Sequence, residues 1–201
     1  MKNHSLLILA IACLTAIVSS CSKEEEAYPN IITEMADMYT DAEGVGNKFI
    51  TDAGVTYTVT NGITDLAPNA LYRILCGYVP SGNNAAIYQA QSVFYLRDST
   101  EIAKTDPTDV MSAWRAGKYI NIYLAPLTQG GTQYWGFIIE KIESGHAWVR
   151  LHHNQNNDPR SYTQPTYASL PVDDIKGIQE GDIITLSIYT FNGIQTWDFK
   201  K

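Results

Sequence analysis

Apolar and polar residues alternate with a period of two, the period of a β-strand, along most of the chain beyond residue 30. Val55 to Thr60, with the sequence VTYTVT, shows this pattern most simply. The turn residues PSGNN of Pro80 to Asn84 separate two longer segments and predict a hairpin. The strands expected in this half are 31–39, 48–51, 55–60, 71–79 and 86–96. These five strands predict a small OB-like barrel, and a plain five-stranded meander is the alternative.

The second half has the same period in better-defined strands. Tyr119 to Ala125 places its aliphatic residues on one face, and Ile183 to Phe191 does the same. Asn192-Gly193 is a strong signal for a two-residue hairpin. Further strands are expected at 134–142, 147–151 and 195–199. Six or seven short strands predict a β-sandwich, so we expect an all-β chain, an OB-like barrel followed by an antiparallel β-sandwich.

The alternation lapses between Asp98 and Asp109, where the sequence DSTEIAKTDPTD is polar, charged and interrupted by Pro107. Such a composition is typical of a segment between domains. We therefore expect an OB-like domain over residues 30–98, a linker over 99–109 and a sandwich domain over 110–201.

The N-terminus has a different pattern. Lys2 and His4 precede an apolar run from Leu6 to Val18 and two serines, which is the layout of a secretory signal peptide. The run is shorter than the roughly 20 apolar residues of a membrane-spanning helix. Val18-Ser19-Ser20-Cys21 resembles the lipobox of bacterial lipoproteins, whose cysteine is acylated and becomes the mature N-terminus. We expect a signal peptide over residues 1–20 and a lipid anchor on Cys21; ordinary cleavage that leaves a free thiol is the alternative.

The residues after Cys21 are acidic. Ser22 to Glu26, SKEEE, resembles the export tag of surface lipoproteins in certain Gram-negative anaerobes. This resemblance implies a lipid anchor in the outer membrane with the protein facing the cell exterior. Residues 21–29 are also expected to form a solvated tether, kept disordered by like-charge repulsion, and the tether alone would leave the membrane leaflet undecided.

Charge and cysteine content narrow the possible partners. The chain has 14 basic and 21 acidic residues; residues 1–20 contain one lysine and no acid, which leaves 13 basic and 21 acidic residues and a net charge of −8. Such a surface repels phosphate backbones, so nucleic acid is not an expected partner. Cys76 would be the one thiol left, so no intrachain disulfide can form. Its alternation with apolar neighbours predicts a buried residue.

Several segments together resemble the NigD-like lipoproteins. They are the lipobox, MSAWRAGKYINIYLA at Met111 to Ala125, LHHNQNNDP at Leu151 to Pro159, and the terminal ITLSIYTFNGIQTWDF. The family pairs an N-terminal OB-like domain with a C-terminal β-sandwich, and the resemblance implies that arrangement here. Where family members commonly have Leu-Arg-His-Asn, this chain has His152 in place of the arginine and keeps His153, Asn154 and Asp158. The family name comes from a protein encoded beside a bacteriocin, which implies an immunity role.

The sequence contains no Gly-x-Ser-x-Gly elbow, His-Glu-x-x-His helix, phosphate-binding loop or paired-cysteine zinc spacing. We therefore expect no enzyme activity and no cofactor. His152 and His153 are neighbours on a predicted strand and point to opposite faces, so they do not easily share a metal ion. His153, Asn154 and Asp158 are expected to organise the loop that follows this strand.

The residues with the clearest potential for binding are aromatic. Trp148 and Arg150 point away from the aliphatic face of their strand, and Tyr119 and Tyr123 do so on theirs. Flat rings beside polar groups suit a sugar ring or a protein contact, so these four residues are candidate ligand-binding residues. The alternative is that the rings pack against the first domain or a long loop.

Two functions are consistent with these features. The favoured one is a noncatalytic surface lipoprotein, anchored to the membrane through Cys21, that binds a protein or glycan in an immunity-like or polysaccharide-uptake accessory role. The alternative is a hydrolase that acts on a surface polymer.

Overall fold

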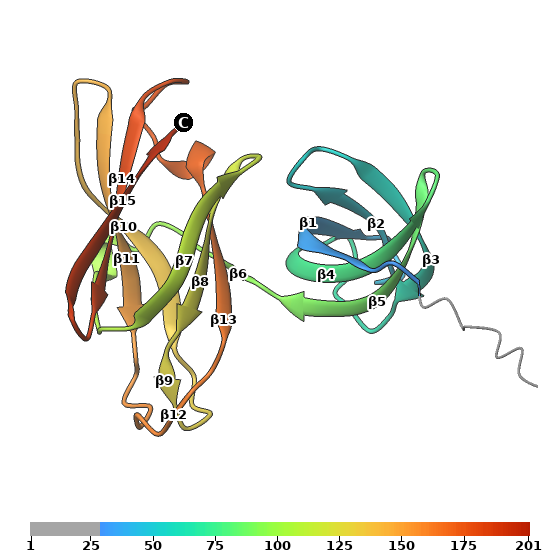
Figure 1. The fold of residues 1–201 in the computed structure, drawn as a ribbon, viewed down its shortest axis with the longest axis horizontal. Coiled ribbons are helices and arrows are strands. Elements are labelled where there is room, and N and C mark those ends of the chain that lie inside the picture. The colour runs from blue at the N-terminus through green and yellow to red at the C-terminus, as the bar shows by residue number, and fades with distance from the viewer. Residues whose placement is uncertain (1–28) are drawn as a thin grey trace, which may run out of the picture. The chain divides into compact units, whose positions relative to one another are not determined.

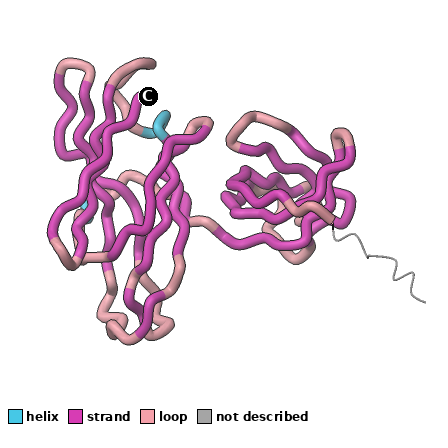
Figure 2. The backbone as a smooth tube through the Cα atoms, viewed as in Figure 1, coloured by secondary structure: helices cyan, strands magenta, loops and turns pink. Residues whose placement is uncertain are grey.

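The computed structural model describes residues 29–201. The expected signal peptide at 1–20, Cys21 and nearly all of the acidic tether lie outside the described residues. The described chain is built from strands, with two short 3-10 helices, η1 (Thr100–Ile102) and η2 (Val172–Asp174) (Figure 2). The predicted all-β fold is therefore confirmed. Within residues 29–201 no helix is long and apolar enough to cross a membrane.

The first half forms a closed five-stranded barrel in the order β1-β2-β3-β5-β4, with β4 closing antiparallel onto β1 (Figure 1). Because β3 pairs in parallel with β5 rather than with β4, the barrel is OB-like and not a simple meander. The expected hairpin between the last two strands is present and turns at Gly82 and Asn83. The strands are β1 (Ile32–Thr40), β2 (Gly46–Thr51), β3 (Thr56–Ile63), β4 (Leu71–Ser81) and β5 (Asn84–Ser92).

Bulges help these short strands to bend into a barrel. The register shifts between Tyr39 and Thr40 in β1 and between Gly77 and Tyr78 in β4, and such bulges increase the local twist. The interior is filled by side chains that include Cys76, which is fully buried as predicted. Burial raises the pKa of the Cys76 thiol to about 12, so the thiol stays protonated and acts as a small apolar group.

The second half forms a sandwich of two four-stranded sheets and a small ribbon of β9 and β12 (Figure 1). The first sheet, in the order β6-β13-β8-β7, is called the β8 sheet here, and the second, β10-β11-β14-β15, is called the β11 sheet. An entirely antiparallel sandwich was expected, but the pairs β6–β13 and β11–β14 are parallel. The strands are β6 (Phe94–Tyr95), β7 (Asp109–Ala116), β8 (Tyr119–Ala125), β9 (Leu127–Thr128), β10 (Tyr134–Glu143), β11 (His146–Asn154), β12 (Tyr162–Thr163), β13 (Thr166–Pro171), β14 (Ile183–Thr190) and β15 (Gly193–Lys200).

The sandwich core consists of the aliphatic faces that the two-residue period predicts. Ile122 of β8, Val149 of β11 and Leu186 of β14 are all fully buried in one cluster. Each such side chain contributes roughly 1.5 to 3 kcal/mol by leaving water. The hairpin of β14 and β15 is present, although its turn lies at Phe191 and Asn192, one residue earlier than expected, and pairs Thr190 with Gly193.

The segment 86–96, expected to be one strand of the barrel, is divided between the two halves of the protein. Residues up to Ser92 pair with β4 of the barrel. Phe94 and Tyr95 pair instead with β13, and Leu96 is fully buried in the sandwich core. The continuous alternation hides the change because both parts are extended, and only the pairing partners show that the chain passes into the sandwich at Val93.

The segment 99–109, expected to be a linker with few contacts, is bound to the β11 sheet. Phe137 of β10 exchanges backbone hydrogen bonds with Arg97 and Ser99, and His153 of β11 does so with Lys104 and Asp106. Residues 97–108, called the strap here, thus cross from β10 to the end of β11. The expectation was wrong because an aperiodic polar segment can still satisfy its backbone groups by pairing with strand edges.

Candidate functional site

Tyr119 does not lie on the protein surface. Only 1% of the residue is exposed, and its hydroxyl donates to the Asp37 carboxylate, with 3.0 Å to each oxygen. The Arg73 guanidinium lies 3.8 Å from the centre of the Tyr119 ring. Burial, assisted by the charge of Asp37, raises the pKa of the Tyr119 phenol. Asp37 and Arg73 belong to the barrel, so this ring packs against the first domain and is not available as a surface ligand-binding residue.

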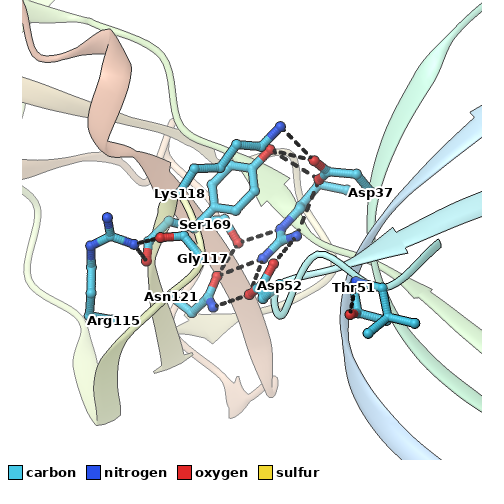
Figure 3. Close-up of polar contacts among 11 residues, drawn as sticks. Asp37, Thr51, Asp52, Arg115, Gly117, Lys118, Asn121 and Ser169 are labelled. Atoms are coloured by element: carbon cyan, nitrogen blue, oxygen red, sulfur yellow. Dashed lines mark hydrogen bonds and ion pairs between the residues drawn. The ribbon is translucent and has the colours of Figure 1, made fainter. Parts of the chain in front are cut away.

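A buried polar cluster joins β1 and β4 to β8 and β13 (Figure 3). Tyr119 belongs to it through its bonds to Asp37. Arg73 Nη1 lies 3.2 Å from Asp37 and 2.7 Å from Asp52. Its Nε donates to Ser169 Oγ and its Nη2 to Asn121 Oδ1, each at 3.0 Å. The buried charge is therefore paired and hydrogen-bonded, which is what a structural joint requires.

The other predicted tyrosine, Tyr123, stacks on Tyr167 of the neighbouring strand, with 4.6 Å between ring centres and 10° between planes. Both residues belong to the β8 sheet. Trp148 and Arg150 belong to the β11 sheet. The four predicted residues therefore do not form one aromatic surface.

Trp148 and Arg150 are half-buried on the outer face of the β11 sheet. The Trp148 ring stacks on His146 at 3.8 Å, and Lys141 Nζ lies 5.4 Å from its centre. Arg150 Nη2 lies 2.5 Å from Glu140 Oε1, whereas its buried Nε has no hydrogen-bond partner within the described residues. These contacts account for the positions of both side chains. The role of Trp148 and Arg150 in ligand binding stays a prediction.

Strands β9 and β12 pair at one end of the sandwich (Figure 1). A cavity of about 470 Å³ is lined by residues of this end. Three aromatic rings contribute to its wall, those of Phe94, Trp135 and Tyr162. The other lining residues carry side-chain amides or hydroxyls, except for two glycines and one proline. They are Pro126, Thr128, Gly130, Gly131, Thr132, Gln133, Gln164 and Thr166.

Asp158 holds one side of this cavity in place. Its buried carboxylate accepts hydrogen bonds from the Thr128 hydroxyl at 2.5 Å and the Gln133 amide at 2.8 Å. It also accepts from the backbone amides of Gln129 and Gly131 at 3.0 and 3.1 Å. These donors, with Thr128 foremost, lower the pKa of Asp158 to about 2. A Cβ at residue 131 would lie 2.6 Å from a carboxylate oxygen of Asp158, so a side chain there would displace the carboxylate.

His153 supports the tryptophan of the same cavity. The rings of His153 and Trp135 stack with 4.0 Å between centres and 6° between planes. His153 Nδ1 lies 2.9 Å from the Asp106 carbonyl, and Nε2 lies 2.9 Å from Gln133 Oε1. Gln133 presents this oxygen because its amide nitrogen donates to Asp158. The contacts connect Asp158, Gln133, His153 and Trp135, so the cavity wall is supported from behind.

His152 points to the opposite side of the strand and accepts a hydrogen bond at Nδ1 from the Lys104 amide of the strap at 3.0 Å. Across residues 29–201, no three His, Cys, Asp or Glu side chains are grouped to hold a metal ion. Asn154 accepts from the Asn156 amide at 3.0 Å. His153, Asn154 and Asp158 thus organise the loop after β11, as their residue types indicate.

The sequence pattern did not predict the aromatic residues of the cavity as binding residues. Phe94 and Tyr162 lie in two-residue strands, and Trp135 follows the segment TQGGTQY. The two glycines of that segment were the available signal, because adjacent glycines allow a close approach of backbone to neighbouring groups. Their partner Asp158 is 27 residues from Gly131 in sequence, so the contact itself could not be predicted from local pattern.

An OB-like barrel followed by a β-sandwich that carries an aromatic cavity defines the class of this chain, an all-β protein. Residues 91–201 match the family model of the NigD-like C-terminal beta sandwich domain. The chain belongs to the NigD-like family. Among curated proteins, none matches it significantly.

Solved structures show the same fold. A NigD-like immunity protein from Bacteroides caccae is similar with a TM-score of 0.64 and 25% identity, over 86% of this chain and 93% of that one. A candidate toxin-related protein from Parabacteroides distasonis has a TM-score of 0.67 at 15% identity, over 86% and 93%. A candidate lipoprotein from Bacteroides fragilis has a TM-score of 0.57 at 11% identity, over 85% and 97%.

Proposed function

We propose that this chain is a noncatalytic lipoprotein of the cell surface that binds a protein or glycan partner through the cavity at the end of its sandwich. The observation that carries the proposal is the support of the cavity by His153 and Asp158. These two residues belong to the segment by which the sequence resembles its family, and both act on cavity-lining groups.

The chemistry of the cavity lining supports binding over hydrolysis. Rings, amides and hydroxyls line the cavity, and none of its lining side chains is a carboxylate or an imidazole. General acid-base hydrolysis of a glycan usually requires two carboxyl groups on either side of the bond that breaks. The hydrolase alternative has no comparable support from this site.

Similar proteins support a role at the membrane surface. The relative from Bacteroides caccae is an immunity protein, and the one from Bacteroides fragilis is a candidate lipoprotein. Together with the lipobox ending at Cys21 and the acidic residues after it, they favour a chain anchored in the outer membrane and facing outward. An immunity-like role and an accessory role in polysaccharide uptake are the two forms of the proposal.

The experiment is a deletion of the gene followed by complementation in the source bacterium. Sensitivity to bacteriocin and growth on polysaccharides are the two measurements. We expect the deletion to change one of them, and we expect wild-type protein and Tyr134→Ala to restore it. Tyr162→Ala should fail to restore it. Tyr134 is the matched control because it is as exposed as Tyr162, at 51% against 52%, and lies outside the cavity. Restoration by Tyr162→Ala would contradict the proposal.

A further inference from the structure

We infer that the cavity between Phe94, Trp135 and Tyr162 binds an uncharged sugar ring of a glycan. This inference rests on the proposed function and names the chemical class of its ligand. It follows from the arrangement of the rings, the free polar groups, the absence of charge in the lining and the support of the walls.

The aromatic rings offer faces for stacking. The centres of Phe94 and Trp135 lie 6.1 Å apart with 43° between their planes, so the two rings form adjoining walls set at an angle. Phe94 is 47% exposed and Tyr162 is 52% exposed. Large apolar side chains that stay this exposed around a concave site are typical of a binding surface. The C–H face of a pyranose ring is apolar and flat enough to lie on such a ring.

Several polar groups of the lining are free to bind hydroxyl groups. The side-chain amide of Gln164, the Thr132 hydroxyl and the Tyr162 hydroxyl have no hydrogen-bond partner within residues 29–201, although backbone atoms of Gln164 and Thr132 do. An amide both donates and accepts, as a sugar hydroxyl also does. The combination of ring faces with free amide and hydroxyl groups matches a hydroxylated ring better than a purely apolar ligand.

The lining contains no charged side chain, so a strongly ionic ligand fits this cavity less well than a neutral one. No Asp, Glu, Lys, Arg or His side chain lines the cavity, so the site offers no counter-ion for a carboxylate, sulfate or ammonium group. The nearest buried carboxylate, that of Asp158, is fully engaged with Thr128, Gln133 and two backbone amides. Burying a ligand anion beside this carboxylate would be costly, and a neutral sugar avoids this cost.

The walls are held before any ligand arrives. Gln133 donates to the Leu127 carbonyl at 3.0 Å as well as to Asp158, and its oxygen faces His153. Trp135 therefore has little freedom to turn, because it stacks on the buried His153 ring, whose nitrogens lie 2.9 Å from the Asp106 carbonyl oxygen and from Gln133 Oε1 and which, as a neutral imidazole, donates to one of the two. A site that is already ordered loses less entropy on binding, which favours a small rigid ligand such as a sugar ring.

The test is binding of the full mature chain in detergent to an array of neutral oligosaccharides with glucose, galactose, mannose and N-acetylglucosamine units. Sialylated and sulfated counterparts of the same oligosaccharides serve as charged probes. We expect at least one neutral oligosaccharide to be retained, and its affinity to be measured by titration. Tyr162→Ala and Phe94→Ala should each weaken it about tenfold, since each removes a stacking surface.

Tyr134→Ala is the matched control and should bind as the wild type does. Thr132→Arg adds a bulky charge to the cavity rim without removing a core side chain, and should abolish retention. Melting curves must show that each variant is folded. The inference is overturned if no neutral oligosaccharide is retained, if only charged ones are, or if neither Tyr162→Ala nor Thr132→Arg weakens binding. If the array fails while Tyr162→Ala still fails to complement the deletion, the cavity binds a protein and the proposed function stands.

Discussion

Nη2 of Arg73 in the barrel lies 3.0 Å from Oδ1 of Asn121 in the sandwich, and both residues are buried. The same guanidinium pairs with Asp37 and Asp52, so one side chain connects carboxylates of the barrel to polar groups of the β8 sheet. A planar fork with five donors can make all these contacts at once, which a lysine could not do.

Arg73→Ala is expected to lower the free energy of unfolding by about 3 to 5 kcal/mol, because the Asp37 and Asp52 carboxylates would lose their buried partner. Arg73→Lys should recover only part of this loss. Urea denaturation followed by tryptophan fluorescence measures the effect. Arg97→Ala, an exposed arginine, is the control and should change stability by less than about 0.5 kcal/mol. A loss no larger for Arg73→Ala than for Arg97→Ala would contradict the prediction.

Gly136→Ala is expected to loosen the strap. A Cβ at this position would lie 2.2 Å from Ser99 Oγ and 2.7 Å from the Arg97 carbonyl oxygen, and the second contact is with backbone that cannot rotate away. We expect a loss of about 1 to 3 kcal/mol, with faster hydrogen exchange at the Ser99 and Phe137 amides. Adding Ser99→Ala should restore part of the stability. Unchanged exchange at both amides would show that the strap tolerates the methyl group.

Stability should fall on mild acidification because of His153. Burial lowers the pKa of His153 from 6.5 to about 4, so the unfolded chain binds a proton between these values that the folded chain does not. The free energy of unfolding should therefore decrease as the pH falls from 6.5 to 4, by up to about 3 kcal/mol. Burial also lowers the pKa of His152, which acts in the same direction. Denaturation at a series of pH values should show a smaller slope for His153→Gln, and an equal slope would refute the assignment.

Lipid attachment is expected at Cys21, which lies outside the described residues. Cys21→Ala should abolish incorporation of labelled palmitate and release the protein from the membrane fraction, because two or more acyl chains are needed for stable anchoring. Cys76→Ala is the control and should keep the label, since Cys76 is buried in the barrel. Incorporation by the Cys21 variant would exclude the lipobox assignment.

The two-residue period predicted most strands because one face of each is covered by a core. The strand predicted at Tyr119 to Ala125 has the observed bounds, and its aliphatic residues are buried. Strand β13 was missed because TYASLP is buried almost throughout, and a strand covered on both faces has no alternation to detect. The sequence pattern does not predict strand β7, because its exposed residues do not alternate clearly.

The functional interpretation was limited by a different factor. The direction of Tyr119 away from the aliphatic face was correct, but the sequence did not indicate that Asp37, 82 residues earlier, would meet it. For the cavity, the segment LHHNQNNDP predicts an organised loop, whereas the rings of the cavity lie on β6, β10 and β12, and His153 of this segment stacks on Trp135 of β10. Contacts between distant segments depend on topology, and a single sequence carries little information about topology.

If the chain is anchored at a membrane as proposed, the strap also has a consequence there. Molecules confined to a surface meet their neighbours at a high local concentration, and an open strand edge is a template for sideways pairing between them. β10 is an outer strand of the β11 sheet, and the bridge between Asp98 and Phe137 occupies part of its edge. Because the strap covers part of that edge, it reduces the tendency of neighbouring chains to pair along the sheet. A chain that loses the strap should therefore aggregate more as its local concentration rises.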